Sequence, residues 1–122
     1  RRNQEDGVTR DEDLLLLVKS AGIGDGEPDL GEKLMVSFFR MLVESGQAPA
    51  RAIFMNSGVF LTTRGSPVLE ALRTLAAAGT EIVSCGTCLD YYKRADKLEI
   101  GAPSTMKETV AALLRYPRVV AP

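Results

Sequence analysis

Hydrophobic residues are almost absent from the start of the chain and then become abundant. Residues 1–12 contain one large apolar side chain, Val8, among charged and amide residues. A segment of this composition buries too little surface to offset the entropy lost on ordering. We therefore predict a polar tail or interdomain linker over residues 1–12 and a folded domain over residues 13–122. The chain starts at Arg1 rather than Met, and we expect another segment to precede it.

From Leu14 onward, short apolar runs alternate with segments of helical periodicity. The runs are too short for helices and end in glycine or polar residues, as strands buried on both faces do. Strands are predicted at residues 14–18, 52–55, 81–84 and 98–100, with a last extended piece at residues 118–121. Apolar positions three and four residues apart predict helices between Asp29 and Gly46, between Ser66 and Gly79, and from Ser104 to about Arg115.

Two of these helices have recognisable N-terminal signals. Asp29, with Glu32 three residues later, has the spacing of a capping box. Ser66 followed by Pro67 fits an N-cap and the first helical position. We expect these residues to satisfy the free backbone N–H groups at the starts of the two helices.

The alternation of strands and helices predicts an α/β fold with three layers, α/β/α, and a mostly parallel sheet of about five strands. In such sheets the loops after the carboxyl ends of the strands carry the ligand-binding residues. Three loops of unusual composition follow predicted strands, at residues 22–31, 56–63 and 85–90. We expect all three to meet at one edge of the sheet.

Composition excludes several classes of function. Fifteen basic and sixteen acidic residues leave a net charge of −1 with no basic cluster, which argues against a nucleic-acid partner. The chain has no histidine, and therefore no serine or cysteine triad and no imidazole metal site. No apolar run is long enough to span a membrane and no signal peptide is visible, so we expect a cytoplasmic protein with reduced thiols and no membrane partner.

The two cysteines form a C-x-x-C motif, Cys85 and Cys88, directly after a predicted strand. Cys88 would lie near the start of a short helix, whose free N–H groups lower the pKa of a thiol. Lys93 and Arg94 would favour the thiolate further, and Asp90 would oppose it. Four interpretations remain open: two buried core residues, a redox disulfide, half of a zinc site shared by a dimer, and a sulfur carrier that holds a persulfide.

Residues around the motif supply candidate binding groups. Asn56, Ser57 and Gly58 end the second strand and would orient a bound sulfur species, and Gly86 and Thr87 lie between the cysteines. Tyr91 and Tyr92 would shield the site or donate O–H hydrogen bonds. The glycines at positions 22, 24 and 26 lack the sixth-position glycine of a dinucleotide fingerprint, so they form either a plain turn or a backbone concavity for an anion or a partner's tail.

Three stretches resemble the C-terminal DsrE-like domain of YedF-type proteins, which are described as sulfurtransferase-like selenium-metabolism proteins. They are FMNSGV at residues 54–59, EIVSCGTCLD at residues 81–90 and STM at residues 104–106. The resemblance extends over residues 13–121 and implies a DsrE/DsrF-like fold, a sulfur-relay setting and frequent oligomerisation. It also implies that the acceptor cysteine of the family is Cys85, and that a TusA-like domain precedes this one.

Together these observations predict a relay in which Cys85 accepts a sulfane sulfur or selenium atom and Cys88 resolves or passes it on. No cofactor and no metal are expected; the predicted partner is a sulfur donor or acceptor protein, with an upstream TusA-like domain as one candidate. Cys85 is expected to be the more exposed nucleophile. The alternative is a non-catalytic interaction domain that acts through oligomerisation.

Self-association is predicted on separate grounds. Five aromatic side chains exceed what one small α/β domain is expected to bury: Phe38, Phe39, Phe60, Tyr91 and Tyr92. An exposed patch formed by them would require a second subunit. We therefore predict a homo-oligomer.

Overall fold

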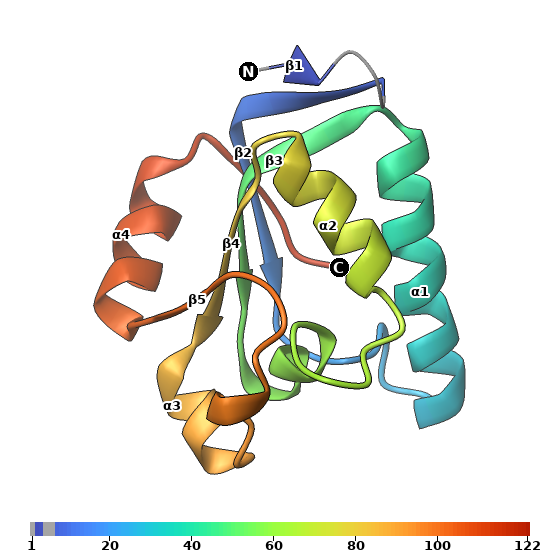
Figure 1. The fold of residues 1–122 in the computed structure, drawn as a ribbon, viewed down its shortest axis with the longest axis vertical. Coiled ribbons are helices and arrows are strands. Elements are labelled where there is room, and N and C mark those ends of the chain that lie inside the picture. Colours follow the sequence, from blue (N-terminus) through green and yellow to red (C-terminus); the bar gives the residue numbers. More distant parts are fainter. Residues whose placement is uncertain (1, 4–6) are drawn as a thin grey trace.

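The computed structural model describes residues 2, 3 and 7–122 and contains one six-stranded sheet (Figure 1). The strands are β1 (Arg2–Asn3), β2 (Val8–Val18), β3 (Gln47–Phe54), β4 (Glu81–Cys85), β5 (Ala102–Ser104) and β6 (Arg118–Val120). Their order is β1-β2-β3-β4-β5, and β6 also pairs with β2. All pairs are parallel except β1 with β2, so the predicted mostly parallel sheet is confirmed.

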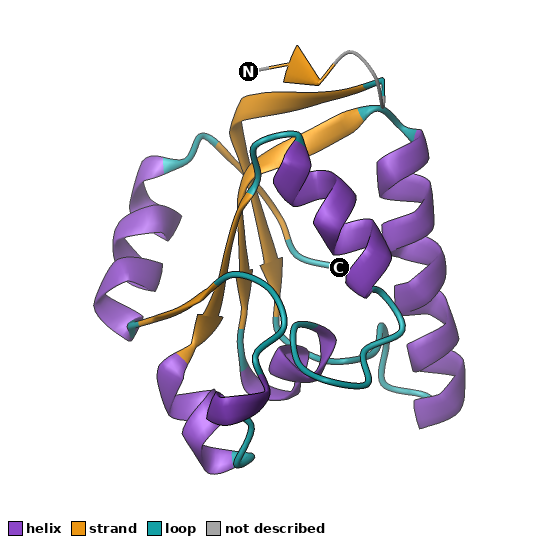
Figure 2. Cartoon of the chain, viewed as in Figure 1, coloured by secondary structure: helices purple, strands orange, loops and turns teal. Residues whose placement is uncertain are grey.

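Helices cover both faces of the sheet and complete the three predicted layers (Figure 2). Helices α1 (Pro28–Glu44) and α2 (Leu69–Ala77) pack on one face, and α4 (Met106–Arg115) packs on the other. Three short helices follow the strands or connect them: η1 (Asn56–Leu61), α3 (Gly86–Tyr91) and η2 (Ala95–Lys97). Since η1 follows β3 and α3 follows β4, both lie at the carboxyl edge, as predicted for the loops there.

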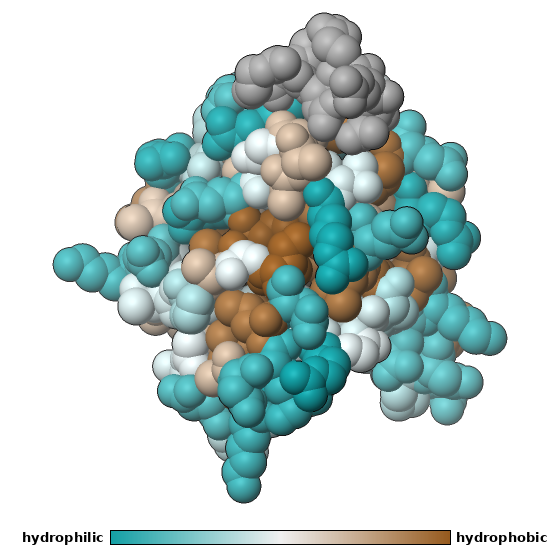
Figure 3. Space-filling model, viewed as in Figure 1, coloured by the Kyte–Doolittle hydropathy of each residue, from teal (hydrophilic) through white to brown (hydrophobic). Residues whose placement is uncertain are grey.

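Each face of the sheet has its own hydrophobic core. The face under α1 and α2 contains the two largest fully buried side chains, Phe39 and Phe54, together with Leu72 and Leu75. The face under α4 contains a smaller cluster of five buried residues, Leu15, Leu17, Ile53, Val83 and Ala112. Figure 3 shows hydrophobic residues exposed between α4 and α2, where β4 and β5 form an edge of the sheet.

Strand β2 begins earlier than predicted. It starts at Val8, which is fully buried, so residues 8–12 belong to the sheet and the predicted tail over residues 1–12 is wrong for this part. Residues 9–11 pair with Gln47, Ala48 and Pro49 at the start of β3, which also begins before the predicted Ala52. The side chains of this polar segment contribute little to a core. Backbone hydrogen bonds with β3 therefore hold it in the sheet. Residues 1 and 4–6 of the predicted tail lie outside the described residues.

Two predicted helix starts are also wrong. The residue before α1 is Glu27, with Pro28 in the first turn and no side-chain cap, so Asp29 and Glu32 form no capping box. Proline has no N–H to satisfy and its fixed φ begins the helix without a cap. Helix α2 begins at Leu69, because Ser66 accepts the N–H of Val68 in a turn that precedes the helix.

The last third of the chain differs at one strand. The predicted strand at residues 98–100 is absent; Leu98 forms an isolated bridge with Thr63, and β5 lies at residues 102–104. Helix α4 begins at Met106 behind a complete capping box of Thr105 and Glu108. The extended piece at residues 118–120 is confirmed as β6.

The predicted aromatic patch is not present. Phe39 is fully buried and stacks near Phe54, while Phe38 is half-buried beside it. Phe60 and Tyr92 are half-buried and pack against each other with ring centroids 4.7 Å apart, which leaves Tyr91 as the one fully exposed ring of the five. Among the described residues no helix has the length and apolar character needed to cross a membrane.

Candidate functional site

Cys85 lies at the junction of β4 and α3. It is the last residue of the strand and the N-cap of the helix, so no loop separates the two elements. Its Sγ accepts a hydrogen bond from the backbone N–H of Cys88 at 3.4 Å. The residue is 8% exposed, and the prediction that Cys85 is the more exposed cysteine is therefore wrong.

Cys88 is half-buried in the first turn of α3, and its Sγ accepts the backbone N–H of Asn56 at 3.1 Å. Burial raises the pKa of the Cys88 thiol, and a hydrogen bond with the Cys85 side chain raises it further, while the Asn56 N–H lowers it. The expected lowering by the helix start is outweighed, because desolvation penalises the charged thiolate. Both cysteines are free thiols.

Asn56 is the residue that connects β3 to the cysteine pair. Its φ of +52° is in the left-handed region, which asparagine tolerates better than most residues. The side-chain Oδ1 accepts the N–H of Ser57 at 2.8 Å and the O–H of Tyr92 at 3.4 Å. The predicted hydrogen bonding by Tyr92 is thus confirmed, with Asn56 as its partner, and the Asn56 amide is held close to Cys88.

The other two residues of this motif have different roles. Ser57 Oγ accepts the N–H of Ala21 at 3.0 Å, on the loop that follows β2. A Cβ at Gly58 would lie 2.5 Å from the carbonyl oxygen of Val18, so this position requires glycine for close packing. Of the three residues, Asn56 alone bonds to a cysteine in the described structure.

The remaining predicted residues are placed as follows. Gly86 is the first residue of α3, and a Cβ there would lie 3.4 Å from the backbone oxygen of Ser104. Thr87 is exposed. Arg94 does not favour a thiolate as predicted, because its guanidinium bonds to Thr63 Oγ1 and to the carbonyl of Arg64 and lies over the Phe60 ring.

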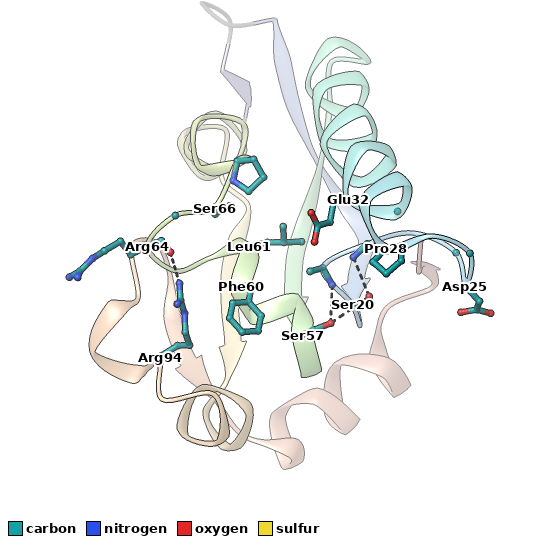
Figure 4. Close-up of a pocket in the computed structure, with 17 residues that line it drawn as sticks. Ser20, Asp25, Pro28, Glu32, Ser57, Phe60, Leu61, Arg64, Ser66 and Arg94 are labelled. Atoms are coloured by element: carbon teal, nitrogen blue, oxygen red, sulfur yellow. Dashed lines mark hydrogen bonds between the residues drawn. The ribbon is translucent and has the colours of Figure 1, made fainter.

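A cleft of about 780 Å³ lies on the other side of η1. Figure 4 shows Phe60, Leu61 and Glu32 directed into it, while Asp25 and Arg64 point away. The glycine-rich loop forms one wall, and its Ile23 N–H bonds to the carbonyl of Gly31 in α1. Neither cysteine lines this cleft. Ser57 lines the cleft and the adjacent Asn56 bonds to Cys88, so η1 separates two distinct regions.

The sequence prediction placed Ser104 at the start of a helix and did not assign it to the site; it is the last residue of β5, and the helix begins at Met106. Ser104 is the register partner of Cys85 on the neighbouring strand and is 7% exposed. Its hydroxyl has no hydrogen-bond partner among the described residues. The signal that would have found it is its place at the end of a strand, which was not visible because the strand was predicted at residues 98–100.

The cysteine pair alone does not complete a zinc site. Within residues 7–122, no group of three or more Cys, Asp or Glu side chains is arranged to hold a metal ion. The pair offers two sulfur ligands and structural zinc takes four.

Comparison with known proteins defines the fold. No protein-family model matches the sequence, and no curated protein matches it. The crystal structure of the ychN protein from E. coli superposes with a TM-score of 0.62 at 18% identity, covering 90% of this chain and 98% of that one. The structure of MTH1491, a protein of unknown function from Methanobacterium thermoautotrophicum, gives a TM-score of 0.64 at 15% identity, covering 93% and 99%.

The chain has the DsrE-like fold. The match spans nearly the full length of both structures, so the arrangement of sheet and helices is shared as a whole. At this level of identity the similarity concerns the fold, and the chemistry of Cys85 and Cys88 has to be argued from this chain.

Proposed function

We propose that this DsrE-like domain is a sulfur carrier of the YedF-type group, in which Cys85 holds a sulfane sulfur or selenium atom as a persulfide or its selenium analogue. The observation that carries the proposal is the pair of free thiols at the carboxyl edge of the sheet, with Cys85 Sγ accepting the N–H of Cys88. A hydrogen bond from an N–H stabilises a thiolate, which is the nucleophilic form. The resemblance at residues 54–59, 81–90 and 104–106 supports the same assignment.

Loading requires no external oxidant. The Cys85 thiolate attacks the outer sulfur of a donor persulfide, R–S–SH. The bond between that sulfur and the donor sulfur breaks as the bond to Cys85 Sγ forms. The products are Cys85–S–SH and the donor thiolate R–S⁻, so charge and protons are conserved.

Cys88 is suited to the second step. Its raised pKa lowers its own thiolate fraction at neutral pH, which disfavours Cys88 as the residue that is loaded first. When Cys88 attacks Cys85 Sγ, the bond to the sulfane sulfur breaks, hydrogen sulfide leaves, and a Cys85–Cys88 disulfide forms. Two equivalents of a cellular thiol then reduce this disulfide. Alternatively, the thiolate of an acceptor protein attacks the sulfane sulfur and regenerates the Cys85 thiolate directly. Both routes require reduced thiols, in agreement with the predicted cytoplasmic location.

Single cysteine variants test the division of roles. Cys85→Ser should abolish the gain of one sulfur atom, measured by intact mass under non-reducing conditions after treatment with cysteine persulfide. Cys88→Ser should still load and should retain the added sulfur longer, because the resolving thiol is gone. Loading that depends on Cys88 alone would reverse the roles, and a wild-type protein that gains no sulfur would contradict the carrier function.

A second candidate function, an oligomeric interaction domain, is favoured by the outer side of the α4 face. Five large apolar side chains of α4 and β6 are exposed there: Met106, Val110, Leu113, Leu114 and Val119. Contiguous exposed apolar surface marks an interaction site, and a second copy of the chain is the partner we propose for it. Light scattering should give a mass above that of one chain, and Val110→Glu with Leu114→Glu should reduce it. A wild-type monomer at high concentration would contradict this, and capture of an upstream TusA-like domain by the same face would replace the second copy.

A further inference from the structure

The hydroxyl of Ser104 is the feature that the proposed loading reaction leaves unexplained. It is more than nine-tenths buried and has no hydrogen-bond partner in the part of the chain that the structure describes, whereas the buried hydroxyl of Ser84 is bonded to Thr62 Oγ1 at 2.7 Å. Burying a hydroxyl without a partner costs about 1–3 kcal/mol. Since alanine in this place would avoid that cost, the unpaired hydroxyl indicates a partner that arrives from outside the chain.

Register places this hydroxyl beside Cys85. Ser104 pairs with Cys85, as Ala102 pairs with Val83 two residues earlier, in a parallel ladder. Side chains of register partners in a sheet lie on the same face, and Val83 belongs to the core under α4. Cys85 and Ser104 therefore project toward that face from adjacent strand ends. The bonded Ser84 and Thr62 lie with the opposite face.

Strand spacing and bond length decide whether a sulfur atom added to Cys85 can reach Ser104. Neighbouring strands are about 4.8 Å apart, and a sulfur–sulfur bond adds about 2 Å to the reach of Cys85. In the unloaded protein Ser104 Oγ forms no hydrogen bond with the Cys85 sulfur. A sulfane sulfur on Cys85 that is directed toward the neighbouring strand would come within hydrogen-bonding distance of the Ser104 hydroxyl.

We infer that Ser104 binds the transferred sulfur, its O–H donating a hydrogen bond to the terminal sulfur of the Cys85 persulfide. The inference rests on the proposed carrier function and adds a binding residue for its intermediate. The bond stabilises the anionic form, Cys85–S–S⁻, and involves no transfer of atoms or electrons. Ser104 thereby slows loss of the sulfur before an acceptor arrives.

The test compares persulfide lifetimes in a Cys88→Ser background, which removes the resolving thiol. The protein is loaded with sodium tetrasulfide, freed of excess reagent, and followed by intact mass. Adding Ser104→Ala should shorten the lifetime of the loaded form about tenfold, the effect of one hydrogen bond of about 1.4 kcal/mol. Adding Ser104→Thr should restore it, because threonine retains the hydroxyl. The pH at which the terminal sulfur is half-protonated, followed by ultraviolet absorbance, should rise with Ser104→Ala.

Ser84→Ala is the matched control, since it removes a buried hydroxyl from the opposite face. It should lower the thermal midpoint and leave the lifetime of the loaded form unchanged. Ser104→Ala should leave the midpoint unchanged or raise it, because an unpaired buried hydroxyl is lost. Equal lifetimes with and without Ser104→Ala would overturn the inference while the carrier function stands; the absence of loading in the parent protein would instead overturn the carrier function. A shorter lifetime in both the alanine and threonine variants, or in the Ser84 control, would assign the effect to packing and overturn the role of the hydroxyl.

Discussion

The two faces of the sheet are covered unequally. Under α1 and α2 the core contains fully buried aromatic and leucine side chains, and these two helices also contact each other. Under α4 a single helix covers five buried residues, and the outer side of that helix remains apolar and exposed. Cys85 and Ser104 project toward the second face, at its carboxyl end.

The larger core and the candidate site therefore lie on opposite faces of the sheet. The free energy gained by hydrophobic burial is proportional to the apolar area removed from water, so the face under α1 and α2 should supply most of the folding free energy. The face under α4 has one covering helix and the smaller core, and Cys85 lies at its carboxyl end.

The strongest test of the comparison is a matched pair of leucine truncations. Leu72→Ala in α2 should cost about 2–5 kcal/mol of unfolding free energy, because a fully buried side chain leaves a cavity. Leu114→Ala in α4, where the side chain is 84% exposed, should change it by less than about 0.5 kcal/mol. Urea denaturation measures both. Similar losses for the two variants would contradict the unequal contribution of the faces.

A second test concerns the edge strand that carries Ser104. Gly101, just before β5, has a φ of +82°, and a Cβ there would lie 2.3 Å from the carbonyl oxygen of Ile82. Gly101→Ala should therefore cost about 1–3 kcal/mol and displace β5 from β4. Gly26→Ala, where a Cβ would meet no atom within 4 Å, should be neutral or slightly stabilising. Hydrogen exchange of the β4 and β5 amides would locate the effect, and an unchanged β5 in Gly101→Ala would contradict this account of the edge.

The third test uses pH at the cysteine pair. Because the pKa of Cys88 is raised, its rate of alkylation by iodoacetamide should continue to rise at pH values where an ordinary thiol is already ionised. In Cys85→Ser the pH at which alkylation of Cys88 is half-maximal should fall. The hydrogen bond and the charge of the Cys85 thiol, which both raise the pKa of Cys88, are removed, while the burial of Cys88 remains. Peptide mass spectrometry separates the two sites. A midpoint that is unaffected by Cys85→Ser would show that the two thiols do not interact.

The smallest expected effect is at the start of β2. Asp11 pairs with Arg118 of β6, and its pKa is lowered chiefly by the N–H of Asp13 and then by Gln47. Arg118→Ala should cost less than about 1 kcal/mol at neutral pH. Because the folded pKa is lowered, the contribution of the carboxylate is present above its unfolded pKa and is lost as pH falls through the folded pKa. The variant and the parent should therefore converge in stability in acid, as measured by urea denaturation at several pH values.

The main layers could be predicted because apolar runs identify strands that are buried on both faces. Leu15, Ile53 and Val83 lie in such runs, and all three are buried in the sheet. The polar half of β2 could not be predicted, since residues 9–11 are held by backbone pairing with β3 that side-chain patterns do not reveal. The same applies to β5, an edge strand that contains Pro103 and has two exposed residues of three.

The candidate site was predicted in outline and not in detail. The strand-end position of Cys85 and the contact of Asn56 with the pair follow from the order of strands and loops. The burial of Cys85 depends on residues from other strands and on the helix that begins immediately after it. Whether burial or a helix start determines the pKa of Cys88 is likewise a balance of three-dimensional surroundings, and here burial is the larger effect.

The capping box that follows β5 has a consequence for the entropy of sulfur binding. The side chains of Thr105 and Glu108 accept each other's backbone N–H groups and fix the first turn of α4. Ser104, the residue before Thr105, is fixed by pairing with Cys85 of β4. Ser104 is held between these two constraints, so its backbone is already ordered before any ligand arrives. A group ordered in advance gives up little conformational freedom on binding, and more of the hydrogen-bond energy is retained as affinity. The short edge strand is thus a preorganised support whose order is established during folding.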